Sequence, residues 1–308
     1  MTIPSKQFLA AESFGKFVRL RPGYIGRVVS VHRSAINIAC TLGPCAQTCL
    51  ADHIMVLLTR APGRVPNGVH LNVAPDGSAT NVAFDLCGIT VGSAVVQVDD
   101  ALSIGDQLRV DLTFASPWDG SVTPVEAIEW VTLASHGALL AGRMSHDPMV
   151  ETRIARFGDV LAHRHCVTDR AQLEAVVSSI MGLGSGSTPT GDDVLLGALA
   201  LLDAAGDEHA TMLRGIVDQI ITEMPLVTTG VSLALLRAAT ARQHAELTGN
   251  LVTAVVRGDA NDVVRAIPLI EAVGATSGRD TVRGVDIAVR SLLARRAGST
   301  ARASLIAS

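Results

Sequence analysis

The spacing of apolar positions divides the chain into two parts. In the first part, short runs rich in Val and Ile alternate with Gly, Pro, Asn and Asp, which is typical of strands joined by turns. The expected strands are Tyr24–Val31, Ala35–Cys40, Ile54–Leu58, Val69–Val73, Ala94–Val98 and Leu108–Phe114. We therefore predict a β-rich domain over residues 1–140, with a barrel-like or sandwich-like architecture.

Helical periodicity begins near the end of that part and governs the rest of the chain. These segments are rich in Ala and Leu, which favour close-packed helices. The expected helices are Val125–Gly142, Met149–Leu161, Ala171–Met181, Asp193–Ala204, Glu208–Met224, Gly230–Glu246, Asn250–Arg257, Ala260–Val273 and Asp280–Ala297. The predicted fold class is α+β, in which an all-helical C-terminal domain over residues 141–308 follows the β-rich domain.

Composition and charge exclude several classes of protein. Hydrophobic residues make up 48% of the 308 and charged residues 18%, which indicates a globular chain. The net charge of −4 argues against a nucleic-acid binder, because phosphate contacts need a basic surface. No apolar run reaches about 18 residues, so we expect no membrane span. The five scattered cysteines and the lack of a signal-peptide pattern favour a cytoplasmic location.

The stretch that most strongly indicates chemistry runs from Gly182 to Gly197 and reads GLGSGSTPTGDDVLLG. Its glycines permit left-handed backbone and close approach of a ligand, and Pro189 prevents a regular helix through the loop. A helix then begins near Asp193, so its amide groups and its dipole point at the loop. We interpret the stretch as a small-anion site with carboxylates beside it. The candidate residues are Gly184, Gly186, Ser187, Thr188, Gly191, Asp192 and Asp193.

The same pattern recurs later in the chain. Residues 190–197 and 277–284 share a hydroxyl residue, Gly, any residue, Asp, three residues and Gly. If the two helix starts face each other, they form one pocket with inward amide groups and carboxylates. The second start adds the candidates Thr276, Ser277, Gly278, Arg279 and Asp280, and a third helix start, TTGVS, adds Thr229 and Ser232.

A purely structural interpretation is available for several of these residues. First-turn acids such as Asp193 and Asp280 stabilise a helix by at most about 1 kcal/mol each. Thr229 and Ser232 are equally well explained as helix caps. Helix capping does not explain the glycine density or the second acid, Asp192, so we favour a functional site.

Several familiar phosphate loops are excluded. Gly186 and Gly191 have the spacing of a P-loop, but Asp192 stands where its lysine would be. The glycine spacing also differs from that of dinucleotide-binding loops, and no nucleophile elbow is present. The remaining chemistry is recognition of a small anion by backbone amides and hydroxyls. Asp192, Asp193 and Asp280 are the candidate ligands if a metal is present, with Mg²⁺ as the candidate ion.

Three motifs together resemble a known family. They read GLGxGxTPxGDD, TTxxS and GxTSGxDxxxG, and they begin here at Gly182, Thr228 and Gly274. They resemble the AllH-like family, long catalogued as a domain of unknown function, over about residues 145–295. Its named member is a subunit of oxamate carbamoyltransferase in anaerobic allantoin breakdown, a part of purine degradation. The family usually has a histidine before Thr-Ser-Gly, whereas Ala275 lies in that segment here, and this departure bears on the substrate.

The resemblance implies reversible carbamoyl transfer between phosphate and a small amide acid such as oxamate. It also implies FdrA-like and AllG-like partner subunits, and a homo-oligomer is left open. On this hypothesis Asp192, Asp193 and Asp280 are catalytic, and the other candidates bind the anionic substrate. Two alternatives remain: a non-catalytic metabolite-binding or scaffold subunit of such a complex, and a stand-alone metal-dependent amide hydrolase.

Overall fold

The structure is a computed structural model of the 308-residue chain. It describes residues 8–17, 24–31, 35–42, 53–58, 63–71, 88–91, 94–98, 108–111, 116–145, 147–163 and 170–306. The chain divides into two compact units, Met1–Gly120 and Ser121–Ser308. The first helix belongs to the second unit, and the division of the domains at residues 140 and 141 stays a prediction.

The described elements of the first unit are strands. They are β1 Phe8–Gly15, β2 Tyr24–Val31, β3 Ala35–Leu42, β4 His53–Leu58, β5 Gly68–Leu71, β6 Gly88–Val91, β7 Ala94–Val98, β8 Leu108–Asp111 and β9 Ser116–Trp118. The order in the sheet is β5-β4-β3-β2-β7-β6-β8-β1-β9, and β5 also pairs with β1. Much of this segment, including residues 72–87 and 99–107, lies outside the described residues. Its barrel-like or sandwich-like architecture therefore stays a prediction.

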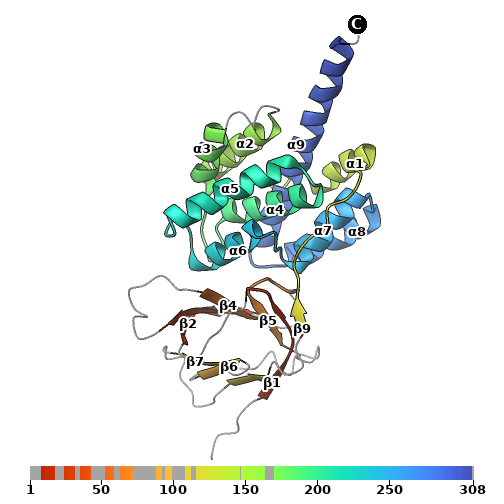
Figure 1. The fold of residues 1–308 in the computed structure, drawn as a ribbon. Coiled ribbons are helices and arrows are strands. Elements are labelled where there is room, and N and C mark those ends of the chain that lie inside the picture. Colours follow the sequence, from red (N-terminus) through yellow and green to blue (C-terminus); the bar gives the residue numbers. More distant parts are fainter. Residues whose placement is uncertain are drawn as a thin grey trace, which may run out of the picture. The chain divides into compact units, whose positions relative to one another are not determined.

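The second unit is helical, which confirms the helical part of the predicted fold (Figure 1). Its helices are α1 Trp130–Leu140, α2 Pro148–Ala162, α3 Arg170–Ile180, α4 Thr190–Ala204, α5 Glu208–Glu223, α6 Gly230–Thr240, α7 Glu246–Arg257, α8 Ala260–Glu271 and α9 Ser277–Ile306. None of the described helices is both long and apolar enough to cross a membrane.

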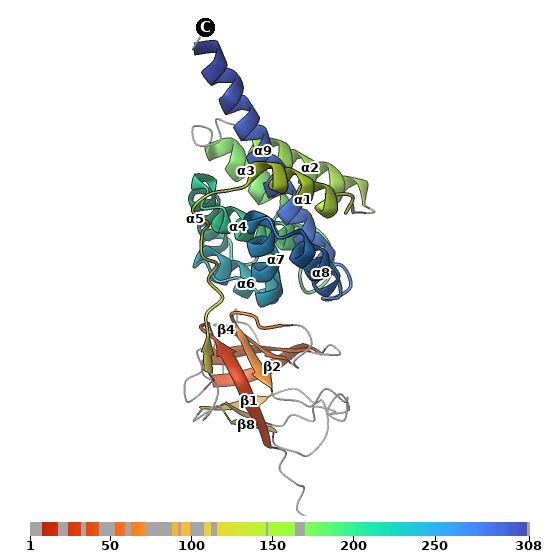
Figure 2. The same cartoon turned by 90° about the vertical axis from the view of Figure 1, so that its right-hand side faces the viewer.

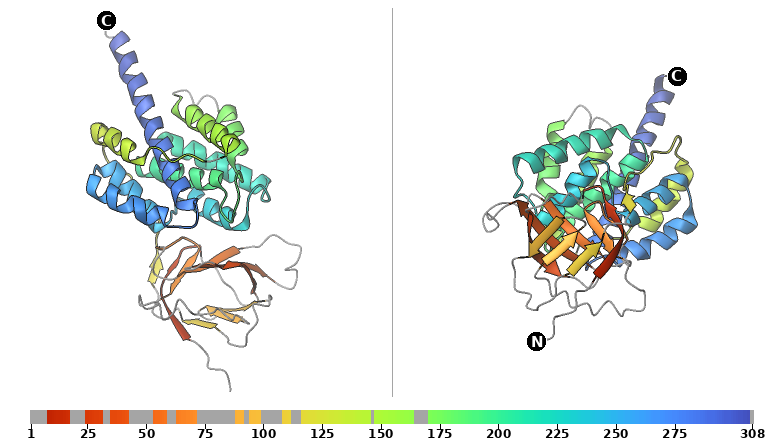
Figure 3. Two further views of the ribbon diagram at one scale, coloured as in Figure 1. Left: turned by 180° about the vertical axis from the view of Figure 1, so that it is seen from behind. Right: turned by 60° about the horizontal axis from the view of Figure 1, so that its bottom comes forward.

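Helix α4 forms the centre of this unit because it is apolar on every side. Nearly all its residues are buried, and α2, α5, α6, α7 and α9 all pack against it (Figure 2). A helix that is hydrophobic all round belongs in the middle of a bundle. Helix α4 is therefore enclosed by its neighbours, whereas the last turns of α9, far from its start, project beyond the other helices (Figure 3).

Helices α4 and α9 cross through a reciprocal pair of glycines. A Cβ atom on Gly197 of α4 would lie 2.0 Å from the carbonyl oxygen of Thr281 of α9. A Cβ atom on Gly284 of α9 would lie 2.1 Å from the carbonyl oxygen of Val194 of α4. No side chain fits at either position, so the two backbones touch. The last glycines of the repeated motif therefore bring the two helices into direct contact.

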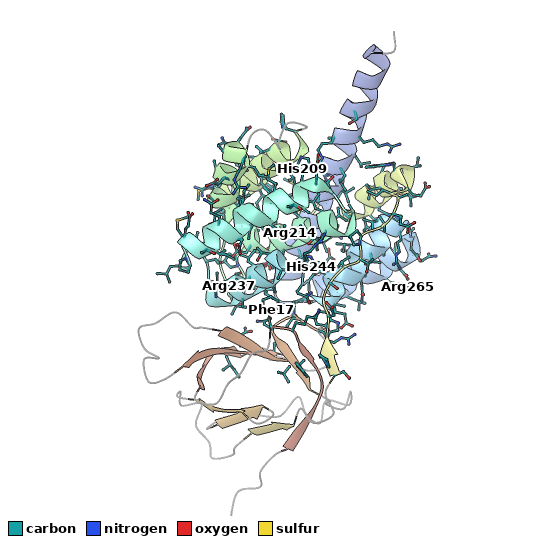
Figure 4. All side chains as sticks on the ribbon, in the orientation of Figure 1. Phe17, His209, Arg214, Arg237, His244 and Arg265 are labelled. Atoms are coloured by element: carbon teal, nitrogen blue, oxygen red, sulfur yellow. The ribbon has the colours of Figure 1, made fainter. Side chains whose placement is uncertain are left out.

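The far end of α4 is held by a buried charge cluster. Asp203 accepts a hydrogen bond from Arg214 of α5, and its Oδ2 lies 2.9 Å from Nε2 of His244. Arg242 lies 3.6 Å from Oδ1 of the same carboxylate. Figure 4 labels Arg214 and His244, which come from different segments. One carboxylate thus fixes the end of α4 to α5 and to the segment after α6.

This cluster explains an error in the predicted helices. The sequence predicts one helix from Gly230 to Glu246, but α6 ends at Thr240. The chain turns at Arg242, which has a φ of 61°, and α7 begins at Glu246. His244 is buried beside Asp203, so the helical spacing of buried positions continues across the turn. Periodicity therefore does not reveal the break.

Candidate functional site

The two motif starts are built by the same local device. A Cβ atom on Gly191 would lie 1.8 Å from the carbonyl oxygen of Ile180, the last residue of α3. A Cβ atom on Gly278 would lie 1.8 Å from the carbonyl oxygen of Ile270 near the end of α8. In both halves a glycine lets the new helix begin directly against the end of the preceding one. The motif repeat is therefore also a structural repeat, as the sequence predicts.

Hydroxyl groups link each start to the carboxyl group of the other. Thr190 of α4 donates a hydrogen bond from Oγ1 to Oδ2 of Asp280 on α9, at 2.9 Å. In return, the Ser277 hydroxyl of α9 lies near enough to Asp193 of α4 to lower the pKa of that carboxyl group. Thr188 and Ser277 are themselves 2.5 Å apart between hydroxyl oxygens. Asp193 and Asp280 are therefore neighbours, with the hydroxyls of Thr188, Thr190 and Ser277 close to them.

Asp193 is the more deeply buried of the two carboxyl groups, at 3% exposed. Burial raises its pKa well above the usual range, and the negative charges of Asp280 and Asp192 raise it further. The nearby hydroxyls of Ser277 and Thr188 lower the pKa and offset part of this effect. Its Oδ2 atom is buried and has no hydrogen-bond partner. This environment favours the neutral form of Asp193 and leaves one of its oxygens without a hydrogen bond.

Asp280 has a different electrostatic environment. It is 9% exposed, and burial raises its pKa as well. The hydroxyls of Thr190 and Thr276 and the guanidinium groups of Arg283 and Arg279 act in the opposite direction. These donors and positive charges favour the ionised form. The two carboxyl groups are thus alike in position and unlike in charge environment.

Asp192 points elsewhere and holds the glycine-rich loop in place. Its Oδ1 accepts a hydrogen bond from the Gly182 amide at 2.8 Å, and its Oδ2 accepts one from the Thr228 hydroxyl. Burial raises its pKa, and these bonds together with the Ser232 hydroxyl lower it. The structure thus gives Asp192 a positioning role. Its predicted catalytic role has no contact with the Asp193–Asp280 pair that would support it beyond a charge effect on Asp193.

The third predicted helix start fastens the same loop. Thr229 caps α6 by accepting a hydrogen bond from the Ser232 amide at 3.1 Å, which confirms the capping interpretation. The same hydroxyl donates to the carbonyl oxygen of Ser187 at 2.5 Å. The α6 start therefore supports the loop from behind. Any contact of Thr229 or Ser232 with a ligand stays a prediction.

The available amide donors lie in the loop rather than in the first turn of α4. The amides of Gly191, Asp192 and Asp193 already donate to the carbonyl groups of Leu183 and Pro189. In contrast, within the described residues the N–H groups from 184 to 188 make no hydrogen bond. Gly184 and Gly186 have φ values of 113° and 99°, and both are exposed. An anion would therefore meet the loop amides first.

The remaining candidates lie on the α9 side. Thr276 and Arg279 are exposed, and Arg279 acts on Asp280 through its charge. Within the described residues, no group of three or more His, Cys, Asp and Glu side chains is placed to hold a metal ion. Because Asp192 binds the loop, the three predicted ligands do not form one cluster. The arrangement gives no support to a Mg²⁺ site.

The sequence analysis missed Arg283, which lies one turn after Asp280. It is buried, binds Glu151 of α2 through Nη2, and acts on Asp280 through its charge. Its Nη1 atom is buried without a hydrogen-bond partner. The spacing of three residues places both side chains on the same side of α9. The spacing of Asp280 and Arg283 could therefore have identified Arg283 as a neighbour of the site from the sequence alone.

Comparison with known proteins adds one finding. Residues 180–289, from the last residue of α3 into α9, match the model of a family described as oxamate carbamoyltransferase subunit AllH. The match contains both motif starts and the α6 start, so it falls on the segment that builds the site. No curated protein and no solved structure matches the chain.

Proposed function

We propose that this chain is an AllH-like subunit of a carbamoyltransferase acting on a small amide acid, and the match of residues 180–289 to the AllH family model supports this. The reaction is the reversible phosphorolysis of an oxalurate-like compound. Hydrogen phosphate attacks the carbamoyl carbon, a C–O bond forms, and the C–N bond to the amide acid breaks. The proton of the hydrogen phosphate goes to the leaving nitrogen, which yields carbamoyl phosphate and oxamate.

One observation carries this proposal: the buried carboxyl pair Asp193–Asp280 with an unpartnered oxygen on Asp193. An amide presents hydrogen-bond donors and an acceptor side by side, and carboxyl groups match both. A buried polar atom without a hydrogen-bond partner lowers the stability of the fold by about 1–3 kcal/mol. A site for a polar ligand accounts for that cost.

The surrounding groups suit the anionic parts of the substrates. The loop amides from 184 to 188 have no internal partners, and residues 184 to 186 are exposed. Consecutive amides in a glycine-rich loop bind phosphate or carboxylate groups. Arg279 is exposed two residues after Ser277 and supplies a positive charge. These donors would also stabilise the oxyanion that develops at the carbamoyl carbon during attack by phosphate.

The test uses the chain assembled with FdrA-like and AllG-like partner subunits, with oxalurate phosphorolysis as the assay. We expect the double variant Asp193→Ala/Asp280→Ala to lower the rate by at least about 100-fold, the scale for removing groups that act in the transition state. The matched control is Asp262→Asn, which changes an exposed first-turn acid of α8. We expect this control to stay within about twofold of wild type. A fully active double variant would refute the assignment.

The same experiment separates the alternatives. If the chain is a non-catalytic metabolite-binding subunit, the double variant should lose affinity for the ligand. The phosphorolysis rate of the complex should then stay at the wild-type value. The stand-alone metal-dependent hydrolase receives no support from the described residues, because they offer no cluster of metal ligands. If the isolated chain hydrolysed oxalurate and a chelator abolished this activity, the hydrolase alternative would be supported.

A further inference from the structure

The two halves of the site repeat in backbone and differ in charge. Along the repeated motif, Asp192 of α4 corresponds to Arg279 of α9, and Leu196 corresponds to Arg283. As a result, two positive charges act on Asp280, whereas the negative charges of Asp192 and Asp280 act on Asp193. The charges nearest to the two equivalent carboxyl groups therefore differ in sign, although burial raises the pKa of both.

Hydrogen bonding divides the pair in the same way. The Oδ2 atom of Asp280 accepts from Thr190 at 2.9 Å, as a carboxylate oxygen does. The Oδ2 atom of Asp193 is buried and meets no donor. A buried ionised oxygen without a donor is strongly disfavoured, whereas a neutral carboxyl group carries its own proton there. The geometry thus suits Asp193 as the donor of an O–H group, and Asp280, which has a donor on Oδ2 and two arginines nearby, as the better acceptor.

We propose that Asp193 and Asp280 form an asymmetric two-point site for a primary amide or carbamoyl group. Asp193, as the neutral acid, donates a hydrogen bond to the carbonyl oxygen, and Asp280, as the carboxylate, accepts one from the NH₂ group. This assignment rests on the proposed function and names the part of the substrate that each carboxyl group recognises. A carboxylate or phosphate group at the same place would meet the Asp280 charge and be repelled.

The asymmetry explains why a small amide acid fits better than its amide-free analogue. Oxamate carries a carboxylate and an amide, so its carboxylate can bind the loop amides while its amide reaches the carboxyl pair. Pyruvate has the same carboxylate and carbonyl groups but a methyl group in place of NH₂. It leaves the Asp280 acceptor unsatisfied. A hydrogen bond to a charged group contributes about 1.5–3 kcal/mol, which corresponds to roughly 10-fold to 150-fold in affinity.

The test measures binding of oxamate and pyruvate to the full chain by titration calorimetry. For wild type we expect oxamate to bind at least about tenfold more tightly than pyruvate. Asp280→Asn removes the charged acceptor and should abolish this preference. Asp193→Asn replaces one neutral donor with another and should keep the preference, with a loss of oxamate affinity of less than about tenfold. Melting temperatures of both variants show that they are folded, and Asp262→Asn is the control for a surface acid.

A spectroscopic readout tests the protonation of Asp193 directly. We expect wild type to show the infrared carbonyl band of a protonated carboxyl group at neutral pH, and Asp193→Asn to lack it. Equal affinity of wild type for oxamate and pyruvate would overturn the inference, as would equal losses in the two variants. If the complex transfers carbamoyl groups while this chain binds oxamate no more tightly than pyruvate, the inference fails and the proposed function stands. An oxamate preference without transfer by the complex refutes the function alone.

Discussion

The crossing of α4 and α9 gives a quantitative prediction for Gly197→Ala. The new Cβ atom would lie 2.0 Å from the Thr281 carbonyl oxygen, and ordinary contacts begin at 3.4 Å. The obstacle is backbone, so the two helices must separate by about 1 Å or more. Overpacking of this kind costs about 1–3 kcal/mol, and a backbone obstacle favours the upper end. Alanine returns about 1 kcal/mol in helix propensity, which leaves a net loss of about 2 kcal/mol.

Differential scanning calorimetry of the full chain measures this loss. For a unit the size of Ser121–Ser308, each kcal/mol shifts Tm by about 2–4 °C, so we expect a decrease of about 4–8 °C. Gly284→Ala should behave in the same way, because its Cβ atom would lie 2.1 Å from the Val194 carbonyl oxygen. The double variant should lose less than the sum, because one separation of the helices makes room for both methyl groups.

The matched control is Gly298→Ala in the same helix, α9. A Cβ atom there would meet nothing within 4 Å, so only helix propensity acts. We expect Tm to rise by about 2–4 °C, from a gain of up to about 1 kcal/mol. If Gly197→Ala raised Tm as the control does, or if the two crossing variants added fully, the direct contact of the two backbones would be refuted.

Three further predictions concern single side chains. Burial and the charges of neighbouring arginines lower the pKa of His244 from 6.5 to about 4. The unfolded chain therefore binds this proton more tightly, and about 3 kcal/mol of stability is lost as the pH falls from about 6.5 to 4. His244→Gln should remove that part of the pH dependence of Tm, and a constant difference from wild type across this range would contradict it. Asp192→Asn should cost about 1–3 kcal/mol, because its NH₂ group faces one of two donors, and should speed proteolysis of the glycine-rich loop; an unchanged loop would argue against the positioning role. Thr190→Val removes the donor to Asp280 and should weaken oxamate binding by about tenfold, whereas Thr190→Ser should restore it; failure of Ser to restore binding would assign the loss to packing.

The arrangement of the two helix starts could be predicted from the sequence because close backbone contacts there admit only glycine. No Cβ atom fits at four glycines of the repeat, Gly191, Gly197, Gly278 and Gly284. Their repeated spacing therefore indicated how both helix starts are arranged. Side-chain direction was not predictable. Adjacent residues on a helix point to different sides, so sequence alone could not separate Asp192, which binds the loop, from its neighbour in the carboxyl pair.

Features that depend on the path of a loop were also out of reach. The first-turn amides of α4 were expected to face a ligand, but the chain before them returns and places the Leu183 and Pro189 carbonyl groups against them. The amides without an internal partner therefore belong to the loop candidates Gly184, Gly186, Ser187 and Thr188, and not to the first turn of α4. The end of α6 was missed because the left-handed residue is Arg242, where the sequence shows no glycine.

The buried charge cluster at the far end of α4 has a mechanical consequence for the site. A helix of this length is a stiff rod of roughly 22 Å, with Asp193 in its first turn and Asp203 in its last. Arg214 and His244 clamp the distal end, and the glycine crossing clamps the middle. The rod therefore cannot slide along its axis or turn without breaking a buried ion pair. Substitutions around Asp203 should consequently misalign the carboxyl pair from the opposite end of the helix, without touching any ligand.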